Sequence, residues 1–477
     1  MATEALRSLP SIDWLLERPL ASRLSVALGR ERVRDVLRHV LDDVRQQLTN
    51  GNAQTVTSTA SLTEEIERRL ESQAEISARP SLRRLINATG VIIHTNLGRA
   101  PLARQAIDAI SEVAAGYSNL EYNLARGERG HRESHCQELL ARLTGSEAAV
   151  VANNNAAAVL LVLNTLAEGG EVIVSRGELI EIGGSFRIPD VMQKSGAVLR
   201  EVGTTNRTRI SDYERAITER TRLILRVHPS NFRIIGFTER PTAQEIGDLA
   251  RRAGIPSYED LGSGCLTDLS PYGIKEEPVV AESLKAGISV VSFSGDKMLG
   301  GPQAGVITGS RDIVDRVRAN PLMRALRVDK LTYAAIEATL RLYERGVATS
   351  EVPVIRAIAA SRDEIAGRAA HFADAVARVA NGRLTATVED GCSIIGGGSA
   401  PEVNLPTVLV TLQDSEMSAS MLEERLRSYK TPIITRTERD RVIIDLRTVA
   451  VEEESYLLDA ISALAQPAPK AAASVEV

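Results

Sequence analysis

The stretch SFSGDKMLGGPQAG, from Ser292 to Gly305, surrounds a single lysine, Lys297, with small and polar residues. It follows the apolar run from Gly287 to Val291, which has the length and composition of a buried strand. A lysine directly after a buried strand is unusual, because Lys is seldom buried without a partner. Lysine occurs at only seven positions, so few other residues could supply a reactive amine. The stretch therefore indicates either a chemically active lysine or an exposed turn.

The composition is that of a large globular protein. The 477 residues are 43% hydrophobic and 25% charged, which predicts a folded chain of several domains. The net charge of −5 argues against a globally basic nucleic-acid binder. The three cysteines form no CxxC pair, and we find neither a secretory signal nor a long apolar run. We therefore expect a cytoplasmic protein without a membrane span or a disulfide framework.

Apolar periodicity divides the chain into four parts. Residues 1–80 predict a helical domain, whose second helix would open at a capping box of Ser61 and Glu64. Arginines and acidic residues are nearly equal in number in this segment. A solvent-exposed helical cap or a dimerisation element therefore explains these helices as well as an RNA-binding function does. Residues 338–465 predict an α+β domain that begins with a long helical part, and residues 466–477 predict a disordered tail.

The second part, residues 81–337, alternates short apolar runs with helical stretches. This alternation predicts an α/β core domain with a mainly parallel sheet. The expected strands are residues 148–153, 171–176, 223–228, 288–294 and 304–309.

Motifs in this core supply what an aldehyde cofactor on a lysine would need. In VVANNNAAAV a strand runs into a helix through Asn154, Asn155 and Ala156, and free amides at a helix start bind anions. Ordinary helix capping would explain the asparagines equally well. Ser292 and Ser294 could donate to the same phosphate group.

Asp260, in YEDLGSG, stands at an expected strand end, where its carboxylate could hold a protonated pyridine nitrogen. Phosphate loop, then Asp260, then Lys297 is the order of fold-type-I pyridoxal phosphate enzymes. In such a site Lys297 is the natural general base, because burial favours its neutral amine.

Long motifs across the chain resemble the bacterial L-seryl-tRNA(Sec) selenium transferases, also called selenocysteine synthases. The resemblance runs from the first turn to about residue 465. Its motifs are NATGVIIHTNLGRAPL (87–102), RGELIEIGGSFRIPDVM (176–192), VGTTNRT (202–208), SFSGDKMLGGPQAG, ALRVDKLT (325–332) and IIDLRTV (443–449).

The resemblance implies an α/β fold-type-I (aspartate aminotransferase-like) transferase with pyridoxal phosphate on Lys297. It implies conversion of seryl-tRNA(Sec) to selenocysteinyl-tRNA(Sec), by β-elimination to dehydroalanyl-tRNA and addition of selenium from selenophosphate. It also implies that residues 1–80 bind the tRNA and that the chain forms a homo-oligomer, a ring of dimers that would be a decamer.

Several site residues follow from the resemblance alone. It assigns selenophosphate binding to Arg99, Arg324 and Arg327, and it makes Asp296 an active-site residue. The segment VHPSNF departs from the family pattern at Pro229 but keeps Ser230 and Asn231 as cofactor-binding residues.

Other readings of these residues stay open. Arg324 and Arg327 would share a face if they lie on one helical turn, and a surface salt-bridge pair would have the same spacing. His94 and His228 could contact the cofactor or pack as ordinary histidines, and Arg436 could approach the substrate. A zinc site of His131, His135 and Cys136 lacks supporting ligands. Alternative functions are a lyase of the same core acting on a small amino-sugar acid, and a non-enzymatic RNA-binding protein.

Overall fold

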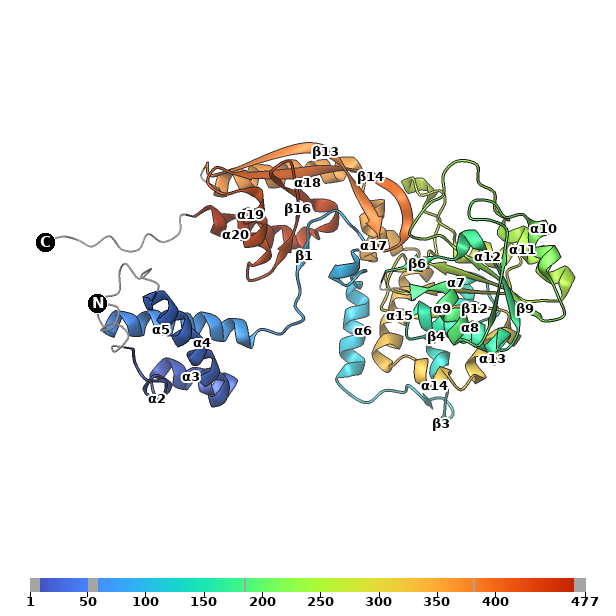
Figure 1. The fold of residues 1–477 in the computed structure, drawn as a ribbon, viewed down its shortest axis with the longest axis horizontal. Coiled ribbons are helices and arrows are strands. Elements are labelled where there is room, and N and C mark those ends of the chain that lie inside the picture. Colours follow the sequence, from blue (N-terminus) through green and yellow to red (C-terminus); the bar gives the residue numbers. More distant parts are fainter. Residues whose placement is uncertain (1–8, 50–58, 184–185, 381, 467–477) are drawn as a thin grey trace. The chain divides into compact units, whose positions relative to one another are not determined.

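The structure is a computed structural model that describes residues 9–49, 59–183, 186–380 and 382–466. The chain divides into two compact units, Met1–Arg84 and Leu85–Val477. Figure 1 shows the first unit in darker blue and the second from lighter blue, at β1, through green to red. Apart from Gln466, the tail predicted for residues 466–477 lies outside the described residues. Within those residues, none of the helices has the length and apolarity that a bilayer crossing requires.

The first unit is helical, as the sequence predicts. Its core contains Val33, Leu37 and Leu41 from one helix and Ile66 from the next, all buried. The predicted capping box is wrong: Ser61 lies inside a helix that already includes Thr59. The helices are α2 (Ile12–Leu16), α3 (Pro19–Leu28), α4 (Arg30–Thr49) and α5 (Thr59–Ala78).

The second unit contains a sheet of order β4-β12-β11-β10-β9-β5-β8 in the described part of the chain. Only β12 runs antiparallel to its neighbours, so the predicted mainly parallel sheet is confirmed. The strands are β4 (Ala148–Ala152), β5 (Glu171–Ser175), β8 (Val198–Val202), β9 (Thr221–Val227), β10 (Ser257–Gly262), β11 (Val290–Ser294) and β12 (Gly305–Gly309).

Helices cover both faces of this sheet. Successive strand residues point to opposite faces, so Val150 joins one buried cluster and Val151 the other. One face is covered by α8 (Asn155–Ala167), α9 (Ile188–Lys194) and α13 (Arg311–Ala319). The other is covered by α7 (Gln137–Thr144), α10 (Ile210–Ala216), α11 (Ala243–Ala253), α12 (Val280–Lys285) and α15 (Lys330–Glu344).

The C-terminal region has an antiparallel sheet of order β13-β14-β17-β16, with helices packed against it. The long helical part expected for residues 338–381 is interrupted at Gly346, which has a positive φ, and at Pro353, which begins a new helix. The elements are α16 (Ala348–Glu351), α17 (Pro353–Ala359), α18 (Arg362–Val379), β13 (Leu384–Gly396), β14 (Ser399–Asp414), α19 (Ala419–Arg427), β16 (Arg436–Glu438), β17 (Arg441–Asp445) and α20 (Glu454–Ala465).

The remaining elements are one helix of 11 residues, α6, and several short segments. They are α6 (Arg104–Ala114), α14 (Met323–Leu326), the paired strands β2 (Tyr122–Asn123) and β3 (Glu128–Arg129), the paired strands β6 (Glu181–Ile182) and β7 (Phe186–Arg187), and the 3-10 turns η1 (Thr95–Leu97), η2 (Arg132–His135), η3 (Arg176–Glu178), η4 (Ser270–Tyr272), η5 (Leu446–Thr448) and η6 (Val451–Glu453).

A strand from the start of the second unit belongs to the C-terminal core. In β1 (Ile86–Asn87), Ile86 pairs in parallel with Ile433 of β15 (Ile433–Ile434). Ile86 is buried in the same cluster as the C-terminal sheet residues. The expected division at residue 337 is therefore crossed by this strand, and also by α15.

Candidate active site

Lys297 lies in the turn after β11, at the carboxyl end of a central strand. Its side chain is buried, with 6% of the residue exposed, and it has no hydrogen bond or ion pair among the described residues. Burial lowers the pKa of Lys297, and the nearby Arg99 charge lowers it further. Asp260, Asp296 and Glu277 act in the opposite direction. The site therefore favours a neutral amine, the form in which lysine is a nucleophile and a base.

Asp260 lies on β10, where its Cα pairs with Ser292 of β11. Its Oδ1 accepts hydrogen bonds from Asn155 Nδ2 at 2.8 Å and from the Gly262 amide at 3.1 Å. Burial raises the pKa of Asp260, while the bond from Asn155 and the charge of Lys297 lower it. A protonated ring nitrogen beside this carboxylate would supply the positive partner that the buried anion lacks.

The start of α8 is shaped as an anion site. Asn154 caps the helix by accepting from the Ala157 amide at 2.8 Å. Asn155 and Ala156 are the first two helical residues, so their amides have no partner within the helix. Gly305 abuts this turn, because a Cβ there would lie 2.1 Å from the Asn154 carbonyl oxygen.

The serines expected at the cofactor differ in their surroundings. Ser292 Oγ lies 2.6 Å from the Tyr258 hydroxyl, and Ser292 pairs with Asp260 across the two strands, which places it beside that residue. Ser294 is buried two residues further along β11. Ser230 Oγ is buried without a hydrogen-bond partner, whereas Asn231 is exposed and donates from Nδ2 to the Glu181 carbonyl at 2.8 Å. Ser230 is therefore more available than Asn231 to bind a ligand.

The three arginines expected to bind selenophosphate lie on different segments of the chain. Arg99 has a left-handed backbone, with φ 64°, and its Nη1 lies 2.7 Å from Asp296 Oδ2. Arg324 is exposed on α14, and Arg327 follows that helix in extended conformation, with Nη1 3.7 Å from Glu121 Oε1. The expectation that Arg324 and Arg327 share a helical face is wrong, because α14 ends at Leu326.

Two residues near Lys297 were missed by the sequence reasoning. Gly398 has φ 68°, and a Cβ built there would lie 3.6 Å from both Lys297 Nζ and Ser230 Oγ. The run GGG in IIGGGSA could have indicated this close approach. Glu277 is buried and accepts the Ala400 amide at 2.9 Å. Its neighbours in the sequence KEEP are those of a solvent-exposed acidic turn. The local sequence therefore does not indicate that Glu277 is buried near Lys297.

The remaining sequence candidates have other partners. Arg436 donates from Nη1 to the Thr89 carbonyl at 2.7 Å. His135 Nε2 lies 3.2 Å from the Leu120 carbonyl. In the part of the chain that the structure describes, no cluster of His, Cys, Asp and Glu could hold a metal ion.

Unpartnered polar atoms show that the site fits a polar cofactor. The buried atoms without a hydrogen bond include Asn155 Oδ1, Ser230 Oγ, Asp296 Oδ1 and His94 Nδ1. Leaving buried polar atoms unpaired costs about 1–3 kcal/mol each, so such a group indicates a site built for a ligand. The residues around Lys297 thus match an aldehyde cofactor that also carries a ring nitrogen and a phosphate.

Comparisons with known proteins identify the family of this chain. The family model of L-seryl-tRNA selenium transferase matches residues 85–450, and that of the selenocysteine synthase N terminal matches residues 6–45. The chain belongs to the L-seryl-tRNA selenium transferase family. The L-seryl-tRNA(Sec) selenium transferase of Geobacter metallireducens is 47% identical over 96% of this chain and 98% of that protein. The one from Nitratidesulfovibrio vulgaris is 49% identical over 93% and 95%.

This family has the fold of type-I pyridoxal phosphate enzymes. A solved structure of D-glucosaminate-6-phosphate ammonia-lyase superposes with a TM-score of 0.55. It covers 80% of this chain and 96% of its own, at 19% identity, so the likeness shows the fold alone. The predicted fold class is confirmed.

Proposed function

We propose that this protein converts seryl-tRNA(Sec) to selenocysteinyl-tRNA(Sec), with pyridoxal phosphate on Lys297 and selenophosphate as the selenium donor. The observation that carries the proposal is the buried, unpartnered amine of Lys297 close to Asp260 and Asp296, in a chain of this family. A lyase acting on an amino-sugar acid is not favoured, because the lyase likeness is one of fold only.

The residues that would hold the cofactor lie at or after the ends of four strands, β4, β9, β10 and β11. Lys297 would bind its aldehyde, and Asp260, oriented by Asn155, would face its ring nitrogen. The amides of Asn155 and Ala156, with the Asn154 cap, would receive its phosphate, together with Ser294 and Ser230. When bound, the cofactor supplies an electron sink that makes the substrate Cα proton acidic.

Side chains of the protein would then transfer protons and bind selenophosphate. Lys297 can take the Cα proton, because burial and Arg99 favour its neutral form. Asp260 would keep the proton on the ring nitrogen by remaining ionised beside it. Arg99, Arg324 and Arg327 would bind selenophosphate, since a guanidinium matches tetrahedral oxyanions through paired hydrogen bonds.

The proposal extends to partners and location. The unit Met1–Arg84 would bind tRNA(Sec), and the chain would assemble into a ring of dimers in the cytoplasm, where aminoacylated tRNA is made. Exposed apolar residues after α6 support assembly, because Tyr117 and Leu124 are 108% and 74% exposed in the single chain.

The decisive experiment joins a covalent assignment to an activity assay. Borohydride reduction followed by peptide mass spectrometry should find the cofactor on Lys297 alone. The same preparation should convert seryl-tRNA(Sec) with selenophosphate, and Lys297→Ala should not. Label on another lysine, or turnover by Lys297→Ala, contradicts the proposal.

A further inference from the structure

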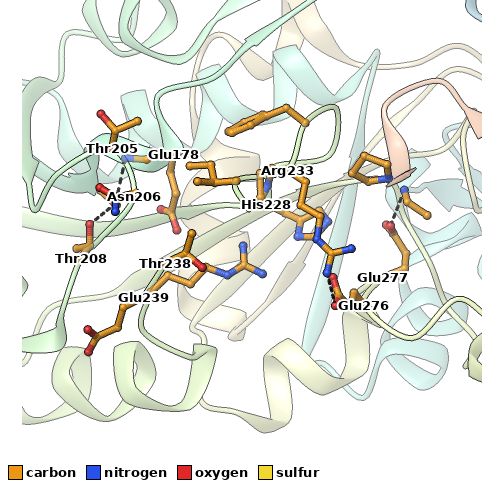
Figure 2. A pocket seen from close by; sticks show the side chains of 18 of the residues that line it. Glu178, Thr205, Asn206, Thr208, His228, Arg233, Thr238, Glu239, Glu276 and Glu277 are labelled. Carbon is orange, nitrogen blue, oxygen red and sulfur yellow. Dashed lines mark hydrogen bonds and ion pairs between the residues drawn. The ribbon is translucent and has the colours of Figure 1, made fainter. Parts of the chain in front are cut away.

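A pocket of about 680 Å³ opens beside the candidate active site. It lies at the carboxyl ends of three parallel strands, with Ser175 as the last residue of β5, Thr205 after β8 and Pro229 after β9. Ligands of open α/β sheets bind at this edge. Figure 2 shows its polar lining, with His228 and Arg233 between Glu178 on one side and Glu277 on the other.

The inner wall of the pocket adjoins Lys297. His228, Glu277 and Ala400 all line the pocket. The charge of Lys297 acts on both His228 and Glu277, and the Glu277 carboxylate accepts the Ala400 amide. Gly398, whose added Cβ would lie 3.6 Å from Lys297 Nζ, is two residues from Ala400. A ligand in the pocket can therefore present a linked group to the lysine.

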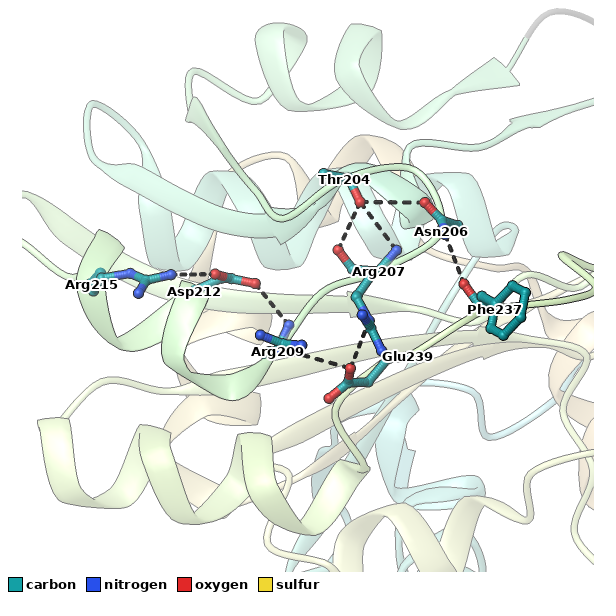
Figure 3. A network of polar contacts seen from close by, with 8 residues as sticks. All are labelled: Thr204, Asn206, Arg207, Arg209, Asp212, Arg215, Phe237 and Glu239. Atoms are coloured by element: carbon teal, nitrogen blue, oxygen red, sulfur yellow. Dashed lines mark hydrogen bonds and ion pairs between the residues drawn. The ribbon is translucent and has the colours of Figure 1, made fainter.

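Two acids of the pocket, Glu276 and Glu239, are paired with arginines. Arg233 Nη2 lies 2.5 Å from Glu276 Oε1, as Figure 2 shows. Arg207 Nε lies 2.8 Å from Glu239 Oε2, and Figure 3 shows this pair in a network that also includes Arg209. In the same network Asn206 Nδ2 donates to the Phe237 carbonyl at 2.7 Å, which holds the loop against its neighbour.

Two cations of the pocket lack such partners. Arg240 and Lys275 both line it, and neither side chain has a hydrogen bond or ion pair among the described residues. His228 adds no charge, because burial and the nearby Arg240 hold its pKa at about 3. Glu178 is buried, which raises its pKa to about 7. Burial also raises the pKa of Glu277. Arg240 and Lys275 are therefore the charged side chains of the pocket that remain available, among the described residues, to bind an anion.

The pocket also has apolar walls and too much room for a small oxyanion. Pro229, Phe232, Ile234, Pro401 and Val403 contribute to its lining. Its volume falls within the range of about 300–1,000 Å³ that encloses drug-sized ligands. Flat apolar surfaces beside unpaired cations are the combination that binds a nucleotide, through stacking of the base and contact with the phosphate.

We propose that this pocket receives the 3′-terminal nucleotide of the aminoacylated tRNA. Its base would lie against Phe232 and the neighbouring prolines, and its 5′-phosphate would contact Arg240 and Lys275, so that the esterified serine extends past His228 to Lys297. The inference rests on the proposed function and names a subsite for it. Selenophosphate could also supply a phosphate group to this pocket. The test distinguishes it from the nucleotide.

The test measures binding to the cofactor-loaded full chain by calorimetry. The probes are L-alaninamide, 3′-(L-alanylamido)-3′-deoxyadenosine and the 5′-monophosphate of that nucleoside. Alanine replaces serine because it has no β-hydroxyl to lose, so the probes cannot turn over. For the wild type we expect about a tenfold gain in affinity from the adenosine and about a further tenfold from the phosphate.

Variants assign these gains to residues. Arg240→Ala combined with Lys275→Ala should abolish the gain from the phosphate and keep that from the adenosine. Phe232→Leu, which keeps much of the side-chain volume, should lose most of the gain from the adenosine. Arg425→Ala is the matched control, because Arg425 is an exposed arginine of α19 that lies outside the pocket and has no ion pair with any residue that the structure describes. It should bind all three probes as the wild type does.

Two results would overturn the inference. One is a wild type in which adenosine and phosphate add no affinity. The other is a double variant that binds the probes normally but has a raised KM for selenophosphate, which would make the pocket a donor site. Either result can occur while the wild type still converts seryl-tRNA(Sec). A wild type that fails in that conversion contradicts the proposed function itself, whatever the probes do.

Discussion

Arg99 Nη1 lies 2.7 Å from Asp296 Oδ2, so an ion pair joins a left-handed loop residue to the residue directly before Lys297. The other carboxylate oxygen of Asp296 is buried without a partner. The pair therefore places a positive charge near the lysine and leaves one acceptor atom free for a ligand.

Removing this charge should change the titration of Lys297. Arg99 lowers the pKa of the amine, so in Arg99→Gln the pKa rises and a higher pH is needed to obtain the neutral form. We expect the pH midpoint for the rate at which cofactor-free protein combines with pyridoxal phosphate to move upward. Stopped-flow absorbance measures this rate, with Arg425→Ala as control. An unchanged or lower midpoint would show that Arg99 does not act on the lysine.

Asp260→Asn should separate catalysis from stability. Activity should fall at least about a hundredfold, because the variant loses a preorganised charge at the ring nitrogen. The cofactor-free variant should nevertheless be more stable than the wild type at neutral pH. Since burial raises the pKa of Asp260, the wild type loses stability as pH rises from the carboxyl's ordinary range toward that raised value.

Denaturant melts of both cofactor-free proteins across the acidic to neutral range test this sign. The stability difference should vanish at low pH, where both side chains are uncharged. A variant that is less stable than the wild type at neutral pH would mean that the ionised carboxylate is well satisfied without the cofactor.

Gly398→Ala should weaken cofactor loading. The left-handed backbone at φ 68° costs a non-glycine residue about 1–2 kcal/mol, and the added methyl would lie 3.6 Å from both Lys297 Nζ and Ser230 Oγ, where the cofactor is expected. The matched control is Gly367→Ala inside α18, where a Cβ meets nothing within 4 Å. That change should gain about 0.5–1 kcal/mol. Thermal melts and the visible absorbance of bound cofactor measure both effects; equal cofactor loading in the two variants would refute the close approach.

Removing residues 1–84 should separate tRNA binding from the chemistry of the site. This unit has its own buried core, and the site around Lys297 lies wholly in the other unit. The shortened chain should keep cofactor absorbance and lose most of its affinity for tRNA(Sec), as filter binding at fixed salt would show. Undiminished affinity would assign tRNA recognition to residues 85–477.

The local pattern of the sequence predicted the elements better than their connections. Short apolar runs predicted β4, β5, β9, β11 and β12 of the central sheet, because burial and strand period are local properties. They did not predict β8, whose residues are mostly exposed or half-buried. The strand Ile86–Asn87 was not predicted, because it pairs with Ile433, which lies hundreds of residues away, and nothing in the adjacent sequence indicates that pairing. The Arg324–Arg327 face failed for a related reason: a spacing of three implies a shared face only while the helix continues.

By itself, the sequence determined the fold class and the family. Long motifs and the order of phosphate loop, Asp260 and Lys297 are properties of the linear sequence. Only the tertiary structure decided which groups meet at the lysine. It placed Asn155 Nδ2 2.8 Å from Asp260 Oδ1 and Gly398 close to Lys297. It also placed Arg240 and Lys275 in one pocket. Such encounters depend on the order of strands in the sheet and on the path of the loops that follow them, and no local stretch of residues encodes either.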